Sequence, residues 1–195
     1  MEAHEFRRQL IPGHGNTRLE HRLWKSDIGE IKRAIKQQLI DNEDIRKLLG
    51  DEKLEQLGDP AEYLYKAIYP YLLIPDSMHE QKAYICFKVD DADTNYFENV
   101  RKENPLMKVV EIQFMIVVHN GVVETDYGID RHDGLAYLIR EMFSYSEKLF
   151  GFKMRCVSDI EGVTDSAFVT RTLTFEVEQP ANLDEFGRRK NQHGN

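Results

Sequence analysis

The residues of this 195-residue chain that could most readily do chemistry are the acids and imidazoles between His119 and Asp133. Asp126, Asp130, His132 and Asp133 lie within eight positions of one another. Carboxylates and an imidazole this close in sequence could bind a divalent cation or transfer protons. The acids can equally cap a helix or form surface ion pairs, and His132, beside a helix start, is expected to be exposed. We predict no catalytic residue here, and we keep a metal-dependent nucleic-acid enzyme using the Asp126–Asp133 loop as an alternative.

A second acidic stretch, Asp90 to Asn95, has spacing that invites a calcium-loop interpretation. It lacks the glycine at the sharp turn and the glutamate at the twelfth position, so a solvated loop is the prediction. The sequence contains no Gly-rich phosphate loop, no nucleophile elbow, no His-Glu-x-x-His and no zinc-type Cys/His spacing. We therefore predict neither a cofactor nor a bound metal.

Two strong elements flank the acidic loop. The run from Val109 to Val118 predicts a central strand whose even positions are all apolar. Asn120-Gly121 has the chemistry of a tight turn. Leu135 to Phe143 is amphipathic at helical spacing, and Gly151 would end that helix. The loop should therefore lie between the middle of a sheet and the helix that covers it.

The remaining segments predict short helices before the sheet and further strands after it. Helices are expected over 28–39, 43–49, 51–57 and 61–69, an extended connector over 70–75, strands over 82–89, 153–158 and 168–178, and a loop over 159–165. Arg171 falls on the inward face of the last strand, so it should pair with an acid unless the strand starts later. The predicted fold class is α+β: a mostly antiparallel β-sheet covered by a long α-helix, with N-terminal helices and extended terminal arms.

The composition is that of an ordinary protein with a formal net charge of −8. This charge opposes general duplex binding, which needs clustered lysine and arginine, but an acidic wall would let DNA slide past. No apolar run is long enough to span a bilayer, and Met1 to Arg8 does not resemble a secretory signal. Cys86 and Cys156 fall in predicted strands, where unpaired apolar fillers in a reducing compartment are expected.

The two ends of the chain differ from its middle. Residues 1–27 form an N-terminal arm that is interrupted by Pro12 and Gly13 and carries apolar anchors including Phe6 and Trp24. The arm either packs on its own domain or docks on a neighbouring subunit. Residues 28–178 form a single core domain. Residues 179–195 form a polar tail containing Arg188 and Arg189, which is either disordered or in contact with a partner or DNA.

The order of these elements carries a family resemblance. Its marks are the Pro70–Pro75 segment, the strands Tyr84–Val89, Ile112–Val118 and Thr172–Val177, and an Arg131-x-Asp133-x-Leu135-Ala136 signature after Gly128. Together they resemble the tail-terminator, or tail-completion, proteins of the neck of tailed bacteriophages, and more loosely other head–tail joining proteins.

The resemblance implies a structural virion protein made in the host cytoplasm. Such proteins assemble as a ring, usually a hexamer, between the head connector and the tail tube, and genomic DNA passes through without sequence-specific binding. The family has no catalytic residues. The interface candidates in this chain are Phe6, Trp24, Arg131, Asp133, Arg188 and Arg189. A soluble adaptor module outside any virion is a further alternative.

Overall fold

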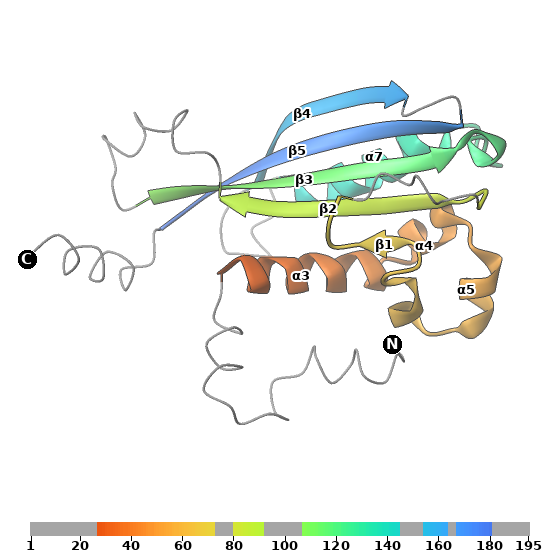
Figure 1. The fold of residues 1–195 in the computed structure, drawn as a ribbon, viewed down its shortest axis with the longest axis horizontal. Helices are drawn as coiled ribbons and strands as arrows, with labels where there is room; N and C mark the ends of the chain where they lie inside the picture. Colours follow the sequence, from red (N-terminus) through yellow and green to blue (C-terminus); the bar gives the residue numbers. More distant parts are fainter. Residues whose placement is uncertain (1–26, 73–79, 92–106, 145–153, 164–166, 181–195) are drawn as a thin grey trace, which may run out of the picture.

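The computed structural model describes residues 27–72, 80–91, 107–144, 154–163 and 167–180. Within them lies a five-stranded sheet of order β1-β2-β3-β5-β4 (Figure 1). The strands are β1 (Ile68–Tyr69), β2 (Ala83–Asp91), β3 (Met107–His119), β4 (Met154–Val163) and β5 (Phe168–Pro180). Only β1 and β2 are parallel, and the other neighbouring pairs are antiparallel. The predicted class, α+β with a mostly antiparallel sheet, is confirmed.

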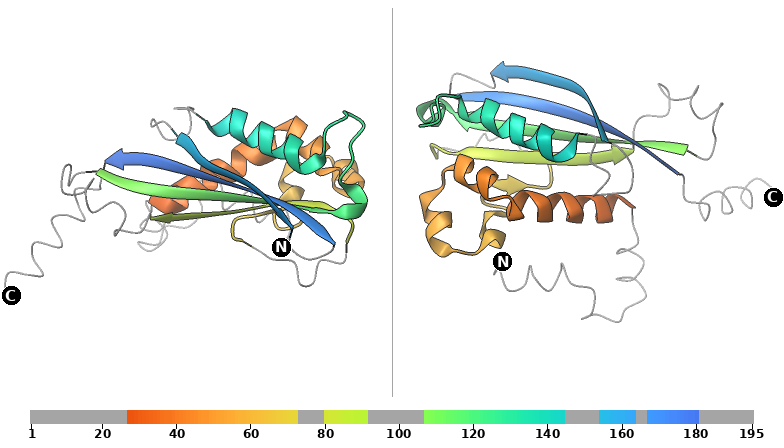
Figure 2. Two further views of the ribbon diagram at one scale, coloured as in Figure 1. Left: turned by 90° about the horizontal axis from the view of Figure 1, so that it is seen from above. Right: turned by 180° about the vertical axis from the view of Figure 1, so that it is seen from behind.

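Helices α3, α4 and α7 lie on one face of this sheet (Figure 2). The helical elements are α3 (Asp27–Asp41), α4 (Glu43–Leu49), α5 (Glu52–Leu57), η1 (Pro60–Tyr63), η2 (Asn120–Val122) and α7 (Arg131–Phe143). Helix α7 packs against β3 and β5, whereas α3 packs against β2. The covering layer is therefore built from both halves of the chain.

The core between the layers follows the alternation of β3. Its even positions, from Val110 to Val118, are fully buried on the helix-covered face. Phe114 lies at the centre: its ring stacks on Phe143 of α7 at 5.1 Å and meets Phe175 edge-on at 5.7 Å and Phe87 at 5.9 Å. Clustered aromatic rings in these geometries add to the stability that burial provides.

Helix ends are set by residues with defined capping chemistry. The Asn42 side chain accepts a hydrogen bond from Ile45 N at 3.0 Å, and Asp51 accepts one from Leu54 N at 3.2 Å. Gly50 ends α4 with a φ of +65°, a left-handed conformation that glycine adopts without strain. The spacing of sequence signals therefore gives correct starts for α4 and α5.

Four expectations from the sequence are wrong. The helix expected to run until Gly151 ends at Phe143, because Ser144 is extended and forms a β-bridge with Met154. Residues 61–69 do not form a helix, because η1 ends at Tyr63 and the chain turns through Tyr65, with a φ of 61°, into β1. The expected loop over 159–165 is strand as far as Val163, because β4 pairs with β5 along its length. His132 is 3% exposed, because α7 begins at Arg131 and its first turn packs down on the sheet.

Other predictions fall outside the described residues or agree with the structure. Phe6, Trp24, Arg188 and Arg189 lie outside the described residues, as does most of the acidic stretch that ends at Asn95. Both cysteines are in strands, and neither forms a disulfide. None of the described helices has the length and apolar character needed to cross a membrane.

Candidate functional site

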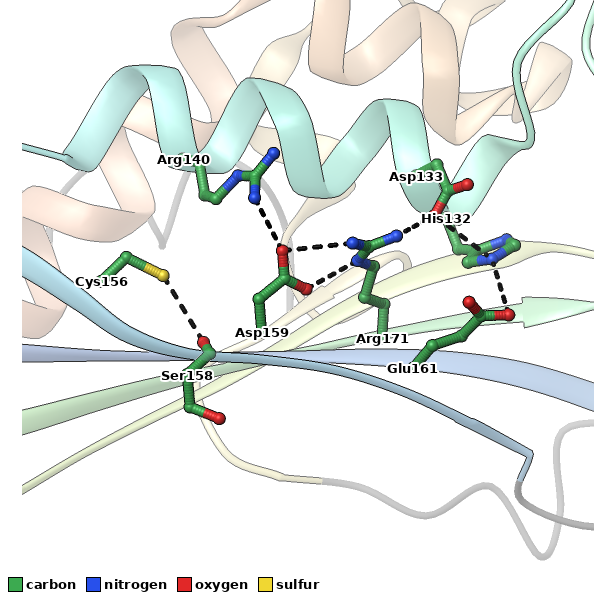
Figure 3. A network of polar contacts seen from close by, with 8 residues as sticks. All are labelled: His132, Asp133, Arg140, Cys156, Ser158, Asp159, Glu161 and Arg171. Atoms are coloured by element: carbon green, nitrogen blue, oxygen red, sulfur yellow. Dashed lines mark hydrogen bonds and ion pairs between the residues drawn. The ribbon is translucent and has the colours of Figure 1, made fainter.

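The densest cluster of charged side chains in the described part of the chain lies between α7 and the strands β4 and β5 (Figure 3). Its centre is Arg171, which projects from β5 on the same face as Leu173 and Phe175. Backbone alternation therefore places a guanidinium at the edge of an apolar core. Such a group needs charged partners there, since a buried unpaired charge is strongly unfavourable.

Arg171 obtains those partners from two other elements. Its Nε and Nη2 donate to Asp159 of β4 at 2.7 and 3.2 Å, and its Nη1 donates to Asp133 of α7. Arg140, two turns further along α7, donates to the same Asp159 at 2.8 Å. The pairing of Arg171 with an acid, predicted from its inward position, is confirmed. The hydrogen bonds that Arg171 donates to Asp159 raise the pKa of the guanidinium above its ordinary value, although burial opposes this.

His132 joins the same cluster from the first turn of α7. Its Nε2 lies 3.5 Å from Asp133 Oδ1 and 3.7 Å from Glu161 Oε1 of β4. Its Nδ1 is buried without a hydrogen-bond partner in the described structure. The imidazole of His132 is therefore buried beneath the first turn of α7, and two carboxylates lie near its Nε2.

The structure brings together only part of the acidic loop. Among the described residues, Asp130, His132 and Asp133 place ligand-type atoms within 4.8 Å of one another. Asp126 is exposed in the loop outside this group. His119 lies at the end of β3, where its Nδ1 accepts from Gly121 N at 3.0 Å and its ring meets Phe168 edge-on.

The three clustered residues offer a divalent cation a poor environment. Asp133 already forms an ion pair with the guanidinium of Arg171. A divalent cation bound to Asp133 would therefore be repelled by this positive charge. Asp130 is exposed, and its side chain makes no capping hydrogen bond at the start of α7. The arrangement holds α7 against β4 and β5 through ion pairs.

Arg131 also holds the start of α7 in place, through hydrogen bonds to two other elements. Its Nε donates to the Val122 carbonyl oxygen at 2.7 Å, and its Nη1 donates to that of Leu48. A Cβ added at Gly50 would lie 2.5 Å from Nη1, so the guanidinium would have to move from its hydrogen bond to Leu48 to make room for it. Arg131 thus connects α4, η2 and α7 within one chain. The subunit contact predicted for Arg131 and Asp133 stays a prediction.

Three members of the cluster were missed by sequence reasoning. Asp159 and Glu161 were assigned to a loop, and Arg140 was treated only as part of an amphipathic helix. The available signal was the inward position of Arg171, which requires an acid on a neighbouring strand. The sequence could not say which acid, because the β4–β5 register contains an irregularity between Cys156 and Ser158. At this bulge Cys156 Sγ donates to the Ser158 carbonyl, and burial raises the pKa of the thiol.

A small hollow of about 170 Å³ lies elsewhere, between α4, α5 and η1. Its lining mixes charged residues, such as Arg46 and Glu55, with Leu54 and Tyr63. Pockets for drug-sized ligands usually occupy about 300–1,000 Å³ and are mainly apolar. This hollow is smaller and more polar than that.

One comparison with known proteins gives a match. The model of the YomW family matches residues 42–177, from the N-cap of α4 into β5. No curated protein and no solved structure matches the chain. The matched range contains β1 to β4, β5 as far as Val177, and the whole ion-pair cluster.

Proposed function

The chain belongs to the YomW family, and YomW is a phage-derived gene product; from this premise we propose that the chain is a structural protein of the phage neck. In this proposal it forms a ring that completes the tail, joins the head connector to the tail tube and lets DNA pass. It acts by assembly and not by catalysis, and its partners are further copies of itself and the two neighbouring virion components.

The observation that carries the proposal is the exposed apolar surface on the edge strand β4. Val157, Ile160 and Val163 are 42%, 62% and 71% exposed, although edge strands usually carry charges that discourage association. The β4–β5 register puts Ile160 on the open face of the sheet and Val163 on the helix-covered face, so exposed apolar side chains border both sides of this edge. A partner bound along the edge would bury them. The polar cluster beside them is engaged in ion pairs within the chain, so the surface is what the fold offers to a partner.

The neck in particular is supported by the order of the elements and by the charge. The resemblance to tail-terminator proteins covers roughly residues 28–178, from the N-terminal helical part to the last strand. The formal net charge of −8 favours passage of DNA over tight binding to it. Both features fit a ring through which a genome moves.

Disruption of the gene in the phage that carries it tests the proposal. We expect separated heads and tails, or tails of abnormal length, in electron micrographs, and normal particles when the wild-type chain is supplied. Intact, normally joined particles from the disrupted phage would contradict the neck assignment.

The metal-dependent enzyme stays a second candidate because Asp130, His132 and Asp133 lie together. Asp130→Asn separates the two ideas, since this exposed side chain makes no capping hydrogen bond. The structural proposal predicts that this variant supports particle formation as well as the wild type. An enzyme that uses Asp130 as a ligand would lose its metal-dependent activity.

A further inference from the structure

The outer side of β4 is open over the second half of the strand. At its first residue, Met154, the inner side pairs with Val177 of β5, and Ser144 forms a bridge on the other side. Over residues 158–163, which we call the β4 edge, the register with β5 is regular, and no described strand lies beyond β4 (Figure 1). In an edge strand, the backbone N–H and C=O groups on the outer side can pair with one further strand.

The side chains of the β4 edge leave apolar surface and a carboxylate in solvent. Ile160, on the open face of the sheet, is 62% exposed, and Val163, on the helix-covered face, is 71% exposed. The side chain of Glu161 is 62% exposed and lies on the same face as Val163. A strand added here would cover side chains on both faces, and it would match the edge best if it carried apolar residues and a cation.

The β4 edge of a second copy does not meet these requirements. Two antiparallel registers overlap most of the segment, one centred on Ile160 and one on Glu161. In the first register Asp159 would lie opposite Glu161 of the second copy, and in the second register the two Glu161 side chains would face each other. Like charges directly opposite one another destabilise a pair of strands. The better occupant is a segment of opposite charge.

The N-terminal arm contains a segment of this kind, although the arm lies outside the described residues. Residues 1–26 carry five arginine and lysine residues against three glutamates, in a chain with a formal net charge of −8. Residues 6–11, Phe-Arg-Arg-Gln-Leu-Ile, equal the β4 edge in length and contain no acid, glycine or proline. The polar tail matches less well, because its basic run 188–190 contains no apolar residue.

One antiparallel register satisfies both the charge and the apolar side chains. With Arg8 opposite Glu161, strand alternation places Phe6 opposite Val163 on the same face. On the open face, Ile11 then lies diagonal to Ile160, within the reach of cross-strand neighbours. The exposed carboxylate thus gains a cation, and each exposed apolar side chain of the edge gains an apolar neighbour.

We propose that residues 6–11 of one copy bind the β4 edge of a second copy as an antiparallel strand. This inference rests on the proposed function, because the contact would join successive subunits of the ring. Each copy supplies one arm and one edge, so the contact is heterologous and can close into a ring. Residues 12–26 form the tether from this strand to α3, and an extended chain of that length spans at most about 50 Å.

Disulfide formation between facing positions tests both the register and the partner. Arg8→Cys and Glu161→Cys are prepared as separate full-length chains in a Cys156→Ala background, and the fully buried Cys86 is left in place. Cβ atoms of directly opposite residues lie about 4.5–5.5 Å apart, so mild oxidation can join them after a small adjustment. We expect covalent dimers in an equal mixture of the two chains and few in either chain alone.

Two controls accompany the oxidation. Arg7→Cys replaces Arg8→Cys in the first, and few dimers with Glu161→Cys are expected, because neighbouring residues of a strand point to opposite faces. Equal yields from Arg7→Cys and Arg8→Cys would overturn the proposal. The second control carries Arg8→Cys and Glu161→Cys in one chain and should give covalent oligomers. Disulfide-closed monomers would overturn the proposal, because the arm would then bind its own domain.

A charge exchange provides an independent measurement on the full chain. Glu161→Arg and Arg8→Glu should each weaken self-association roughly tenfold in sedimentation equilibrium, with unchanged thermal unfolding, and the double variant should recover most of the loss. Glu124→Arg is the matched control, since it makes the same charge change at an exposed position in the loop before α7. Equal weakening by Glu161→Arg and Glu124→Arg would overturn the proposal. So would a wild-type chain that stays monomeric at every concentration, alone and with tail-tube protein.

The outcomes separate this inference from the neck function. Rings that form without cross-links between arm and edge, in a phage whose disruption separates heads from tails, would retain the function and remove the inference. Cross-links between Arg8→Cys and Glu161→Cys, in a phage whose disruption leaves normal particles, would retain the contact and remove the function.

Discussion

Arg171→Met should destabilise the domain more than any other single change in its ion-pair cluster. Methionine keeps the apolar stem but leaves Asp159 and Asp133 without their shared cation. Breaking a buried ion pair costs about 3–5 kcal/mol, and an exposed one about 0–1 kcal/mol. The Arg171, Asp159 and Asp133 side chains are 23%, 19% and 34% exposed, so an intermediate loss of about 2–3 kcal/mol is expected.

Urea unfolding followed by circular dichroism measures this loss. With a denaturant slope of about 2 kcal/mol per molar, the midpoint should fall by about 1–1.5 M. The melting temperature should fall by about 5–10 °C for a domain of this size.

Arg140→Met is the matched control. Its guanidinium makes one hydrogen bond to Asp159, at 2.8 Å, and its side chain is 44% exposed. A loss below about 1 kcal/mol is expected. Arg171→Lys should recover only part of the stability, because an ammonium cannot bind Asp159 through two fixed donors. Equal destabilisation by Arg171→Met and Arg140→Met would refute the idea that Arg171 holds the cluster together.

Four further predictions concern the core, the caps and the arm. Phe114→Ala should lower the free energy of unfolding by about 3–5 kcal/mol in urea titrations, because it leaves a cavity among three aromatic rings. Gly50→Ala should cost at least about 1–2 kcal/mol, since φ is +65° and a guanidinium lies where the methyl group would go; a change below about 0.5 kcal/mol would contradict this. Burial, the largest single influence, raises the pKa of Asp51, but the hydrogen bonds from Lys82 and from two backbone N–H groups, together with the charge of Lys82, lower it by more. The net pKa of Asp51 is therefore lowered, and the stability that its carboxylate contributes is lost as pH falls below about 4. Asp51→Asn keeps a good capping residue, so its stability deficit at pH 7 should shrink in unfolding experiments as pH falls towards 2. Deleting residues 1–24 should leave a folded domain with weaker assembly by light scattering, and unchanged assembly would exclude a clasping arm.

The parts of the fold that the sequence predicts well are those where local chemistry agrees with packing. The alternation from Val110 to Val118 identifies both the central strand and its buried face, because that strand has neighbours on both sides. The helix after Asn42 is equally clear, since its cap and its C-terminal glycine are both local signals. Where packing between distant segments decides, as at β1 and at residues 159–163, local patterns give the wrong element.

The candidate site, too, is predicted only in part, because its contacts join distant segments of the chain. Asp133 and Arg171 are 38 residues apart, and the sequence shows only that Arg171 needs an acid. Choosing among the acids requires the β4–β5 register and the position of α7. The burial of His132 likewise follows from the helix beginning at Arg131, one turn earlier than its apolar pattern suggests.

The irregularity at Val157 has a consequence for the tendency of the protein to aggregate. A regular, exposed edge strand with apolar side chains can recruit identical strands without limit and seed fibrils. In β4 the extra residue interrupts the backbone, and at the opposite edge β1 is only two residues long and is followed by Pro70. Neither edge offers a long template, so growth of one continuous sheet through many copies is discouraged. The exposed apolar side chains on β4 can therefore stay on the surface without seeding a continuous sheet.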